Sequence, residues 1–516
     1  MNWKKFKTAY KDSGQIDESH FILGIDLGND TSVISYFNAS LAQPEVLDIS
    51  GGYGKPSVPT VMQYIAETKE WVFGEYAVLN VSKHAMLTSL VERLGKKEYV
   101  DIENRSVPVT NVLSQYIKEL VGNIKNINPK GEIVGIIVSV PSYVSQEAKE
   151  ELLLAFHNAG YEKELIDLIP DRECIFSRYY FDNQAKEENI LLLDFGSRQL
   201  RGGLYAATPG DMGVSIKTLS SLFDDNTGTK RVNDAVVKMF KEYYCNQLNI
   251  HEDTLNSATM VQLNAFVYQH KDLLFQKNIA TKPVRMYFNF AYPPFQRTVT
   301  KNEIDSVIAP FHSNMEVFLR QVLEKNVYSE QKPQDVNVVI CTGGGFEMLW
   351  ARKLIENYFP NSRVVFYKNS KTAIAEGATI IAASELNVVK GHNLQIEDRN
   401  QLDMDIGVYI LSGGKKRFLP IIEKNSFWWQ NPSPKIFIIK EETNKPLGIY
   451  KREGEGGLNL LEEIMPALPS RPKGTTKLKL EMRFESYHHL AVTIADMGFG
   501  ELFPKSAYKE TFVIEV

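Results

Sequence analysis

Two stretches of the sequence decide the fold: Phe21-Ile-Leu-Gly-Ile-Asp-Leu-Gly-Asn-Asp-Thr-Ser32 and, far along the chain, Leu191-Leu-Leu-Asp-Phe-Gly-Ser-Arg-Gln-Leu-Arg-Gly-Gly-Leu-Tyr205. In each, a short apolar run carries an aspartate at its tip, Asp26 or Asp194, and glycine with small polar residues follows. The pattern predicts a strand that ends in a carboxylate and leads into a tight turn, where glycine permits close approach of the backbone to a ligand. Two such turns can hold a polyphosphate and its magnesium ion between them.

A third glycine-bearing stretch, Val338-Val-Ile-Cys-Thr-Gly-Gly-Gly-Phe-Glu347, lacks the acidic residue and suits contact with a nucleoside. A strand followed by glycine is common, so each stretch alone is a weak signal. Three of them in this order predict nucleotide binding between two lobes.

Length and composition narrow the function classes. A chain of 516 residues exceeds what one core usually serves, so two to four domains are expected. The net charge of −5 gives no electrostatic reason to expect nucleic acid or an anionic membrane as a partner. The sequence also contains no apolar run of the roughly 20 residues that span a bilayer. We therefore expect a cytoplasmic protein with neither of these partners.

Strand and helix patterns alternate over residues 21–385, which predicts an α/β architecture. The predicted strands are 21–27, 33–37, 133–140, 190–195 and 336–341, and the predicted helices are 109–124, 145–158, 232–248, 349–358 and 372–384. Ser145 is the expected N-cap of its helix.

The character of the sequence changes near residue 386. Residues 403–516 consist of short strands separated by turn residues, which predicts a β-sandwich-like module. Residues 386–402 form the expected linker and residues 1–20 an N-terminal extension. No helical pattern follows the β module within this sequence.

This combination resembles the DnaK-like family of seventy-kilodalton heat-shock chaperones. Ile25-Asp-Leu-Gly28 and Leu193-Asp-Phe-Gly196 match the family's two phosphate turns, and Thr342-Gly-Gly-Gly345 resembles an adenosine-side motif. The resemblance implies a two-lobed actin-like (ribonuclease H-like) ATPase domain over 21–385, followed by a peptide-binding-like β-sandwich over 403–516 without the family's helical lid.

The resemblance also implies ATP or ADP and Mg²⁺ as cofactors. Asp26 and Asp194 would hold the metal and take part in catalysis, and Asp171 would orient the attacking water. A turn-capping carboxylate is the structural alternative for each aspartate. The residues expected to contact the nucleotide are Gly28, Asn29, Asp30, Thr31, Gly196, Ser197, Arg198, Lys271, Gly343, Gly344 and Gly345.

In the β module, the resemblance implies binding of an extended peptide or client protein by strand-like hydrogen bonds and an apolar pocket. Val408, Leu411 and Gly413 fall on the corresponding family positions, although plain sandwich core explains Val408 and Leu411 equally well. A co-chaperone or exchange factor is a further expected partner.

Two departures from the family pattern leave the activity open. Glu92 stands where the family has its catalytic lysine, and Arg201 stands where an aspartate is usual. One hypothesis is that Arg198 or Arg201 supplies the lost positive charge. The first functional interpretation is an ATP-binding chaperone homologue with slow hydrolysis. The alternative is a non-catalytic nucleotide-sensing or nucleotide-free scaffold that docks one dedicated partner.

Overall fold

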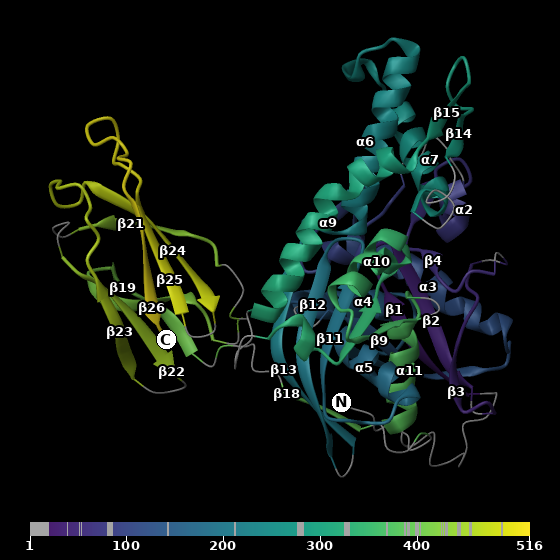
Figure 1. Ribbon diagram of the computed structural model, residues 1–516, viewed down its shortest axis with the longest axis horizontal. Helices are drawn as coiled ribbons and strands as arrows, with labels where there is room; N and C mark the ends of the chain where they lie inside the picture. Colours follow the sequence, from purple (N-terminus) through teal and green to yellow (C-terminus); the bar gives the residue numbers. More distant parts are fainter. Residues whose placement is uncertain are drawn as a thin grey trace. The chain divides into compact units, whose positions relative to one another are not determined.

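The computed structural model describes most of the chain, and its contacts divide the chain into two compact units (Figure 1). The described residues are 20–38, 40–50, 52, 54–79, 86–141, 144–210, 213–275, 283–324, 331–367, 370–385, 389, 393–397, 402, 404–424, 426, 428, 432–440, 445–453, 457–486 and 489–516. We call the two parts the α/β unit (Met1–Lys217, Phe223–Arg320 and Lys332–Ile396) and the β unit (Thr218–Leu222, Gln321–Gln331 and Glu397–Val516).

The first sheet of the α/β unit has six strands, in the order β10-β9-β1-β2-β3 with β4 paired to β2. Their bounds are β1 His20–Leu27, β2 Thr31–Asn38, β3 Gln43–Val46, β4 Val58–Pro59, β9 Glu132–Val140 and β10 Ile166–Pro170. β1 and β2 form an antiparallel hairpin, and β9 runs parallel to β1 on its other side. The strands that the sequence predicts at 21–27, 33–37 and 133–140 are thereby confirmed.

The second sheet repeats this arrangement with six strands, in the order β17-β16-β11-β12-β13-β18. Their bounds are β11 Glu188–Phe195, β12 Leu200–Gly210, β13 Gly213–Asp224, β16 Val338–Thr342, β17 Arg363–Phe366 and β18 Asn393–Glu397. β11 and β12 form an antiparallel hairpin, and β16 runs parallel to β11. The edge strand β18 lies within residues 386–402, the expected linker. Most of that range is outside the described residues.

Helices complete the α/β unit, and those predicted from periodicity are confirmed within a few residues. The helices are α2 Gly74–Leu79, α3 Val109–Gly122, α4 Gln146–Asn158, α5 Asp171–Asp182, α6 Thr229–Leu248, α7 Ser257–Phe275, α9 Lys301–Glu324, α10 Leu349–Tyr358 and α11 Ala373–Glu385. Ser145 caps α4 as expected, because its hydroxyl accepts a hydrogen bond from Ala148 N at 3.2 Å. Three short hairpins are also present: β5 Met62–Ile65 with β6 Glu70–Phe73, β7 Tyr99–Ile102 with β8 Arg105–Pro108, and β14 Val284–Phe288 with β15 Phe295–Val299.

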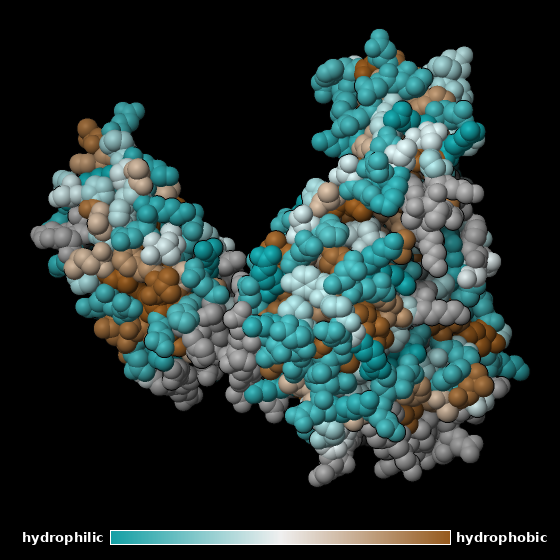
Figure 2. Space-filling view, viewed as in Figure 1, coloured by the Kyte–Doolittle hydropathy of each residue, from teal (hydrophilic) through white to brown (hydrophobic). Residues whose placement is uncertain are grey.

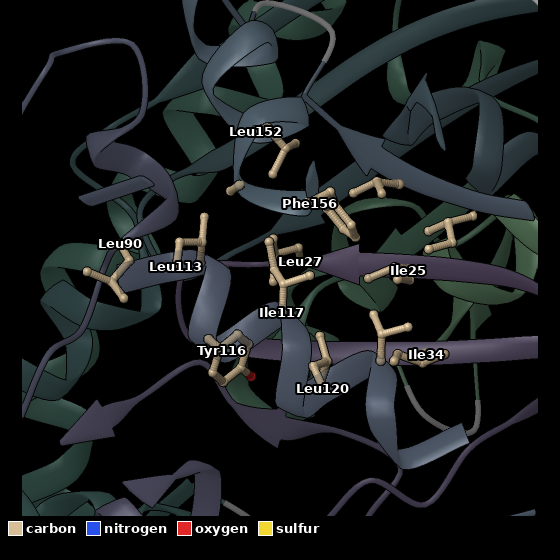
Figure 3. Close-up of a cluster of buried hydrophobic side chains, with 14 of the residues drawn as sticks. Ile25, Leu27, Ile34, Leu90, Leu113, Tyr116, Ile117, Leu120, Leu152 and Phe156 are labelled. Carbon is tan, nitrogen blue, oxygen red and sulfur yellow. The ribbon is translucent and has the colours of Figure 1, made fainter. Parts of the chain in front are cut away.

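Alternation along β1 sends its residues into two different cores. Ile25 and Leu27 are buried in a cluster with residues of α3 and α4, among them Ile117 and Phe156 (Figure 3). Ile22, on the other face of the strand, packs in a second cluster with residues of α5 and α11. Asp26 has the parity of Ile22, so packing of the apolar residues directs its carboxylate toward the start of α5.

Helix α11 is held close to its neighbours by glycines. A Cβ on Gly377 would lie 1.8 Å from Cys174 O of α5, and one on Gly24 of β1 would lie 2.3 Å from Ala375 O. Only glycine permits these two backbone approaches. The start of α5 is thus fixed against the sheet that carries Asp26.

The β unit consists of two four-stranded antiparallel sheets, in the orders β20-β19-β22-β23 and β21-β24-β25-β26. Their bounds are β19 Met404–Ser412, β20 Lys415–Ile422, β21 Lys435–Ile439, β22 Leu447–Glu453, β23 Leu458–Ile464, β24 Thr476–Ser486, β25 His489–Asp496 and β26 Lys509–Glu515. One shared core contains Val408, Trp428 and Leu480. Residues at the turn of the β19–β20 hairpin, Gly413 (φ 59°) and Gly414 (φ 76°), take the positive φ angles of a two-residue hairpin turn.

Hydrophilic residues cover most of the face of the α/β unit that Figure 2 shows. Within the described part of the chain, no helix combines the length and the apolar character needed to cross a membrane.

Candidate functional site

A cavity of about 350 Å³ lies in the α/β unit where the ends of β1, β11 and β16 meet. It is lined by most of the residues that the sequence predicts for a site: Asp26, Gly28, Asn29, Asp30, Thr31, Asp171, Asp194, Gly196, Ser197, Arg198, Gly343 and Gly344. The structure therefore brings the three glycine-bearing segments together.

The two hairpin turns at the cavity share one geometry. Gly28 N donates to Thr31 O at 3.2 Å, and Gly196 N donates to Gln199 O at 3.0 Å. The second turn is further fixed by the start of α6, where Thr229 N donates to Gly196 O at 3.0 Å. Each turn is thus a closed loop held at the tip of a buried strand.

Strand register gives each aspartate two direct neighbours. Asp26 lies opposite Ser139 of the parallel strand β9, and Ser139 Oγ donates to Asp26 Oδ1 at 3.1 Å. Asp194 lies opposite Thr342 of the parallel strand β16, whose hydroxyl is 3.5 Å from Asp194 Oδ1. A hydroxyl residue therefore supports each carboxylate from the same side.

The antiparallel neighbours of the two aspartates differ. Asp26 is paired with Val33, whereas Asp194 is paired with Arg201. In each pair, one residue lies two positions before the first residue of the turn and the other lies two positions after the last. The second hairpin thus carries a cation where the first carries an apolar side chain.

The Arg201 guanidinium bridges two buried carboxylates. Its Nε donates to Asp194 Oδ2 at 2.9 Å, and its Nη2 donates to the same oxygen. Its Nη1 donates to Asp171 Oδ2, at the first residue of α5. Asp171 Oδ1 in turn accepts a hydrogen bond from Arg172 N at 2.7 Å. Each oxygen of Asp171 therefore accepts one hydrogen bond from the protein, and the role of this residue in orienting a water molecule stays a prediction.

Asp26 is the carboxylate without an arginine opposite it. Burial and the nearby charge of Asp194 raise the pKa of Asp26 to about 7, although the hydrogen bond from Ser139 acts in the opposite direction. Burial also raises the pKa of Asp171, against the lowering effect of Arg201. The cavity thus combines one arginine-bridged pair of carboxylates with a third carboxylate that holds its proton unusually well.

These residues do not fit the predicted magnesium site. Asp194 Oδ2 already accepts two hydrogen bonds from Arg201. A divalent cation about 5 Å from the guanidinium would be repelled by about 7 kcal/mol at an effective dielectric constant of 20. Asp26 and Asp194 as paired metal ligands is therefore a prediction that the geometry disfavours.

Arg198 lies beside Glu92. The Glu92 amide donates to Asn29 Oδ1 at 2.8 Å, which holds the 3₁₀ turn Val91–Arg93 against the first hairpin turn. Arg198 Nη1 is 3.8 Å from Glu92 Oε2, and Arg198 Nε is 3.7 Å from Asp225 Oδ1. The Arg198 side chain is half exposed, so these ion pairs contribute little stability. Of the two arginines in the charge hypothesis, Arg198 is the one near Glu92, whereas Arg201 neutralises the aspartates.

The three glycines of the third segment have two roles: two of them line the cavity, and one packs against Phe195. Gly343 has φ +87°, and a Cβ on it would lie 2.6 Å from Phe195 O, so glycine is required there. Gly344 lines the cavity. Gly345 instead packs beneath the Phe195 ring, where a Cβ would lie 2.1 Å from Cγ, and it does not line the cavity. The side chain of Lys271 lies outside the described residues.

The predicted peptide-contacting residues of the β unit do not share one surface. Val408 is 2% exposed and belongs to the sandwich core, whereas Leu411 is 52% exposed. Residues three positions apart in a strand point to opposite faces. The pocket that both were predicted to line is therefore not formed by β19, and of the two only Leu411 is available to a partner. Gly413 serves the hairpin turn.

Several residues that line the cavity were not predicted from sequence as site residues, among them Ser139 and Lys371. Ser139 could have been found from the parallel pairing of β9 with β1, because its position follows from the ends of the two strands. Lys371 also lines the cavity, and no sequence pattern distinguishes it from an ordinary turn residue.

Comparison with known proteins finds relatives along most of this chain. It is 21% identical over 503 residues to the chaperone protein DnaK of Thermosipho africanus (strain TCF52B), which covers 94% of this chain and 79% of the relative. It is 22% identical over 515 residues to the chaperone protein DnaK of Thermotoga petrophila, covering 94% and 80%. The chaperone protein DnaK of Picrophilus torridus is 22% identical over 504 residues, covering 93% and 76%.

Two family profiles match parts of the chain. Residues 401–516 match a domain of unknown function (DUF8552), and residues 43–204 match the C-terminal part of a family of unknown function (DUF5716). The first match covers most of the β unit, and the second covers a stretch of the α/β unit that includes Asp171, Asp194 and Arg201.

Proposed function

Because this chain is a divergent member of the DnaK-like family of seventy-kilodalton heat-shock proteins, we propose that its chaperone-like role combines two binding activities. The α/β unit binds ATP or ADP in the cavity between the two hairpin turns, and the β unit binds an extended peptide or a protein segment. Hydrolysis of ATP, where it occurs, is slow. The cytoplasm remains the predicted location.

The observation that carries nucleotide binding is the convergence of three glycine-bearing turns on one cavity. Turns whose backbone amides approach a common space suit phosphate oxygens. Gly28–Thr31 and Gly196–Gln199 would contact phosphates, and Gly343 and Gly344 would contact the nucleoside side.

Peptide binding by the β unit is supported by its exposed edge strand β20. Lys415, Lys416 and Arg417 are all exposed along this strand, and Lys416 Nζ lies 4.4 Å from the centre of the Tyr409 ring. An edge strand can add an extended peptide through main-chain hydrogen bonds. Three neighbouring basic side chains would favour an acidic segment.

The Arg201–Asp171 ion pair supports a second candidate, a binder without turnover. In that case nucleotide regulates the protein, or stabilises it, without being hydrolysed. Single-turnover measurement with radiolabelled ATP distinguishes the two, because a slow ATPase releases phosphate from bound ATP and a binder does not.

Isothermal titration of the full chain with ADP and with ATP tests nucleotide binding. Gly344→Phe should abolish it, because Gly344 lines the cavity and its Cβ would meet only the flexible Lys371 side chain, at 3.0 Å, so the ring can fill the space. Gly122→Ala is the matched control, because a Cβ there meets nothing within 4 Å. Absence of binding by the wild type, or equal binding by Gly344→Phe, would refute the nucleotide site.

Peptide binding is tested separately, with one unfolded peptide prepared in an acidic and a basic version. Fluorescence anisotropy should show tighter binding of the acidic version, and Lys416→Glu should reduce the preference. No binding of either peptide would refute the role given to the β unit.

A further inference from the structure

We infer that the Arg201 guanidinium is the resident cation of this cavity, so that the chain binds nucleotide phosphates without Mg²⁺. This inference rests on the nucleotide binding proposed above. It states which group balances the negative charge of the phosphates, and whether the protein needs Mg²⁺ from solution to bind them.

The strand ladder itself builds the position of Arg201. Asp194 and Arg201 are directly paired across the β11–β12 hairpin, two residues before Gly196 and two residues after Gln199. The residue paired with Asp194 therefore lies next to the turn at 196–199, which would contact phosphate. The first hairpin, with Val33 opposite Asp26, shows that the same backbone accepts an apolar residue there. The arginine is thus a property of this sequence and not a requirement of the hairpin.

The contacts of Arg201 hold its guanidinium beside Asp194, one of the two predicted metal ligands. It bridges Asp194 and Asp171, two carboxylates from different elements, and is itself only 21% exposed. Asp194 Oδ2 accepts from both Nε and Nη2, so coordinating a metal through this oxygen requires breaking the pair. Arginine stays protonated at any physiological pH, and its planar group suits both carboxylate and phosphate.

Arg201 also lines the cavity that the phosphate turns enclose. A bound polyphosphate would therefore meet a guanidinium that the protein supplies itself, whose charge offsets one of the two carboxylates that it bridges. Asp26 has no cation opposite it, so its carboxylate would face the phosphates with no metal between them. Without Mg²⁺, Asp26 therefore opposes phosphate binding, whereas in a magnesium site the same residue would be a required ligand.

The test compares ADP affinity of the full chain in magnesium buffer and in EDTA by isothermal titration. The wild-type Kd should differ by less than about threefold between the two buffers. Asp26→Asn should bind ADP as tightly as the wild type or severalfold tighter. A tenfold or greater loss of wild-type affinity in EDTA, or loss of binding in Asp26→Asn, would overturn the inference.

Two arginine variants make the test specific. Arg201→Gln should make ADP binding depend on Mg²⁺ by tenfold or more. Arg198→Gln removes an equal charge from the same cavity, so it should change the affinity but leave the ratio between the two buffers as in the wild type. An unchanged ratio in folded Arg201→Gln would contradict the inference, and the wild-type comparison decides it if this variant does not fold.

A third readout separates this inference from the proposed function. Thermal unfolding with Mg²⁺ alone, without nucleotide, should leave the wild-type midpoint unchanged and raise that of Arg201→Gln or Arg201→Asp. If the wild type binds no nucleotide in either buffer, the proposed function fails, and this measurement still shows whether Arg201 excludes the metal. A midpoint raised by Mg²⁺ in the wild type would refute the exclusion.

Discussion

Arg201 lies directly opposite Asp194 in the β11–β12 ladder, and its Nε donates to Asp194 Oδ2 at 2.9 Å. The same guanidinium holds Asp171 at the start of α5. One side chain therefore joins the second hairpin to a helix that follows the first sheet. The arrangement gives Arg201 a structural as well as an electrostatic part in the cavity.

The first prediction concerns this bridge. Arg201→Gln should lower the free energy of unfolding by about 3–5 kcal/mol at pH 7, because it leaves two buried carboxylates without their cation. Arg198→Gln should cost only about 0–1 kcal/mol, because its ion pairs are half exposed and 3.7–3.8 Å long. Denaturant unfolding of both variants measures the difference. Equal, small effects would show that the bridge does not stabilise the fold.

A second prediction concerns the crossing of α5 and α11. Gly377→Ala should destabilise the chain by at least about 3 kcal/mol or prevent folding, because the new Cβ would lie 1.8 Å from Cys174 O. Gly122→Ala, at the last residue of α3 with no atom within 4 Å of its Cβ, should be neutral or stabilising by up to about 1 kcal/mol. Thermal unfolding of the two variants side by side checks this. A stable Gly377→Ala protein would mean that the helices are not in such close contact.

The third prediction concerns pH and the β unit. Asp496 is fully buried and accepts hydrogen bonds from Arg471 Nη1 at 2.8 Å and Nη2 at 2.7 Å. Burial acts to raise the pKa of Asp496, but the hydrogen bonds from Arg471 and from the amides of Gly498 and Ser506 outweigh it and hold the pKa well below its usual range.

Because the folded-state pKa is lowered, the pair stabilises the β unit fully above the ordinary aspartate pKa of about 3.9 and progressively less as the pH falls below it. Asp496→Asn should cost about 3–5 kcal/mol at pH 7. The cost should shrink by about 1 kcal/mol at pH 3. Asp405→Asn is the control, because its partner Arg452 is 43% exposed, and a smaller cost is expected. Hydrogen exchange of peptides from β25 reports the unfolding of the β unit, and it measures the cost of each substitution at the two pH values. A cost that does not change with pH would contradict the assigned ion pair.

Much of the fold could be predicted from the sequence because period and capping are local signals. The β1–β2 hairpin, the Ser145 cap of α4 and the limits of α10 all follow from apolar spacing and turn residues. Strand β18 was not predicted in this way, although Asn393–Glu397 alternates polar and apolar residues, because the run is only five residues long and pairs only at the edge of a sheet.

The candidate site was predictable to the level of segments but less so to the level of contacts. The convergence of the glycine turns follows from their places at strand ends. The Asp194–Arg201 pair could have been found by counting across the turn, because each residue lies two positions from the nearest end of the turn at 196–199. Its closure onto Asp171 depends on how α5 packs, which local sequence does not encode. Val408 and Leu411 are three positions apart in β19, so strand alternation places one in the core and the other on the surface.

The most direct test of the account is a crystal structure of the full chain grown with ADP and Mn²⁺, measured at the manganese absorption edge. We expect ADP phosphates between the turns at 28–31 and 196–199, with Arg201 still bridging Asp171 and Asp194 and no anomalous peak at ligand distance from Asp194. A manganese peak shared by Asp26 and Asp194, with Arg201 displaced, would contradict it.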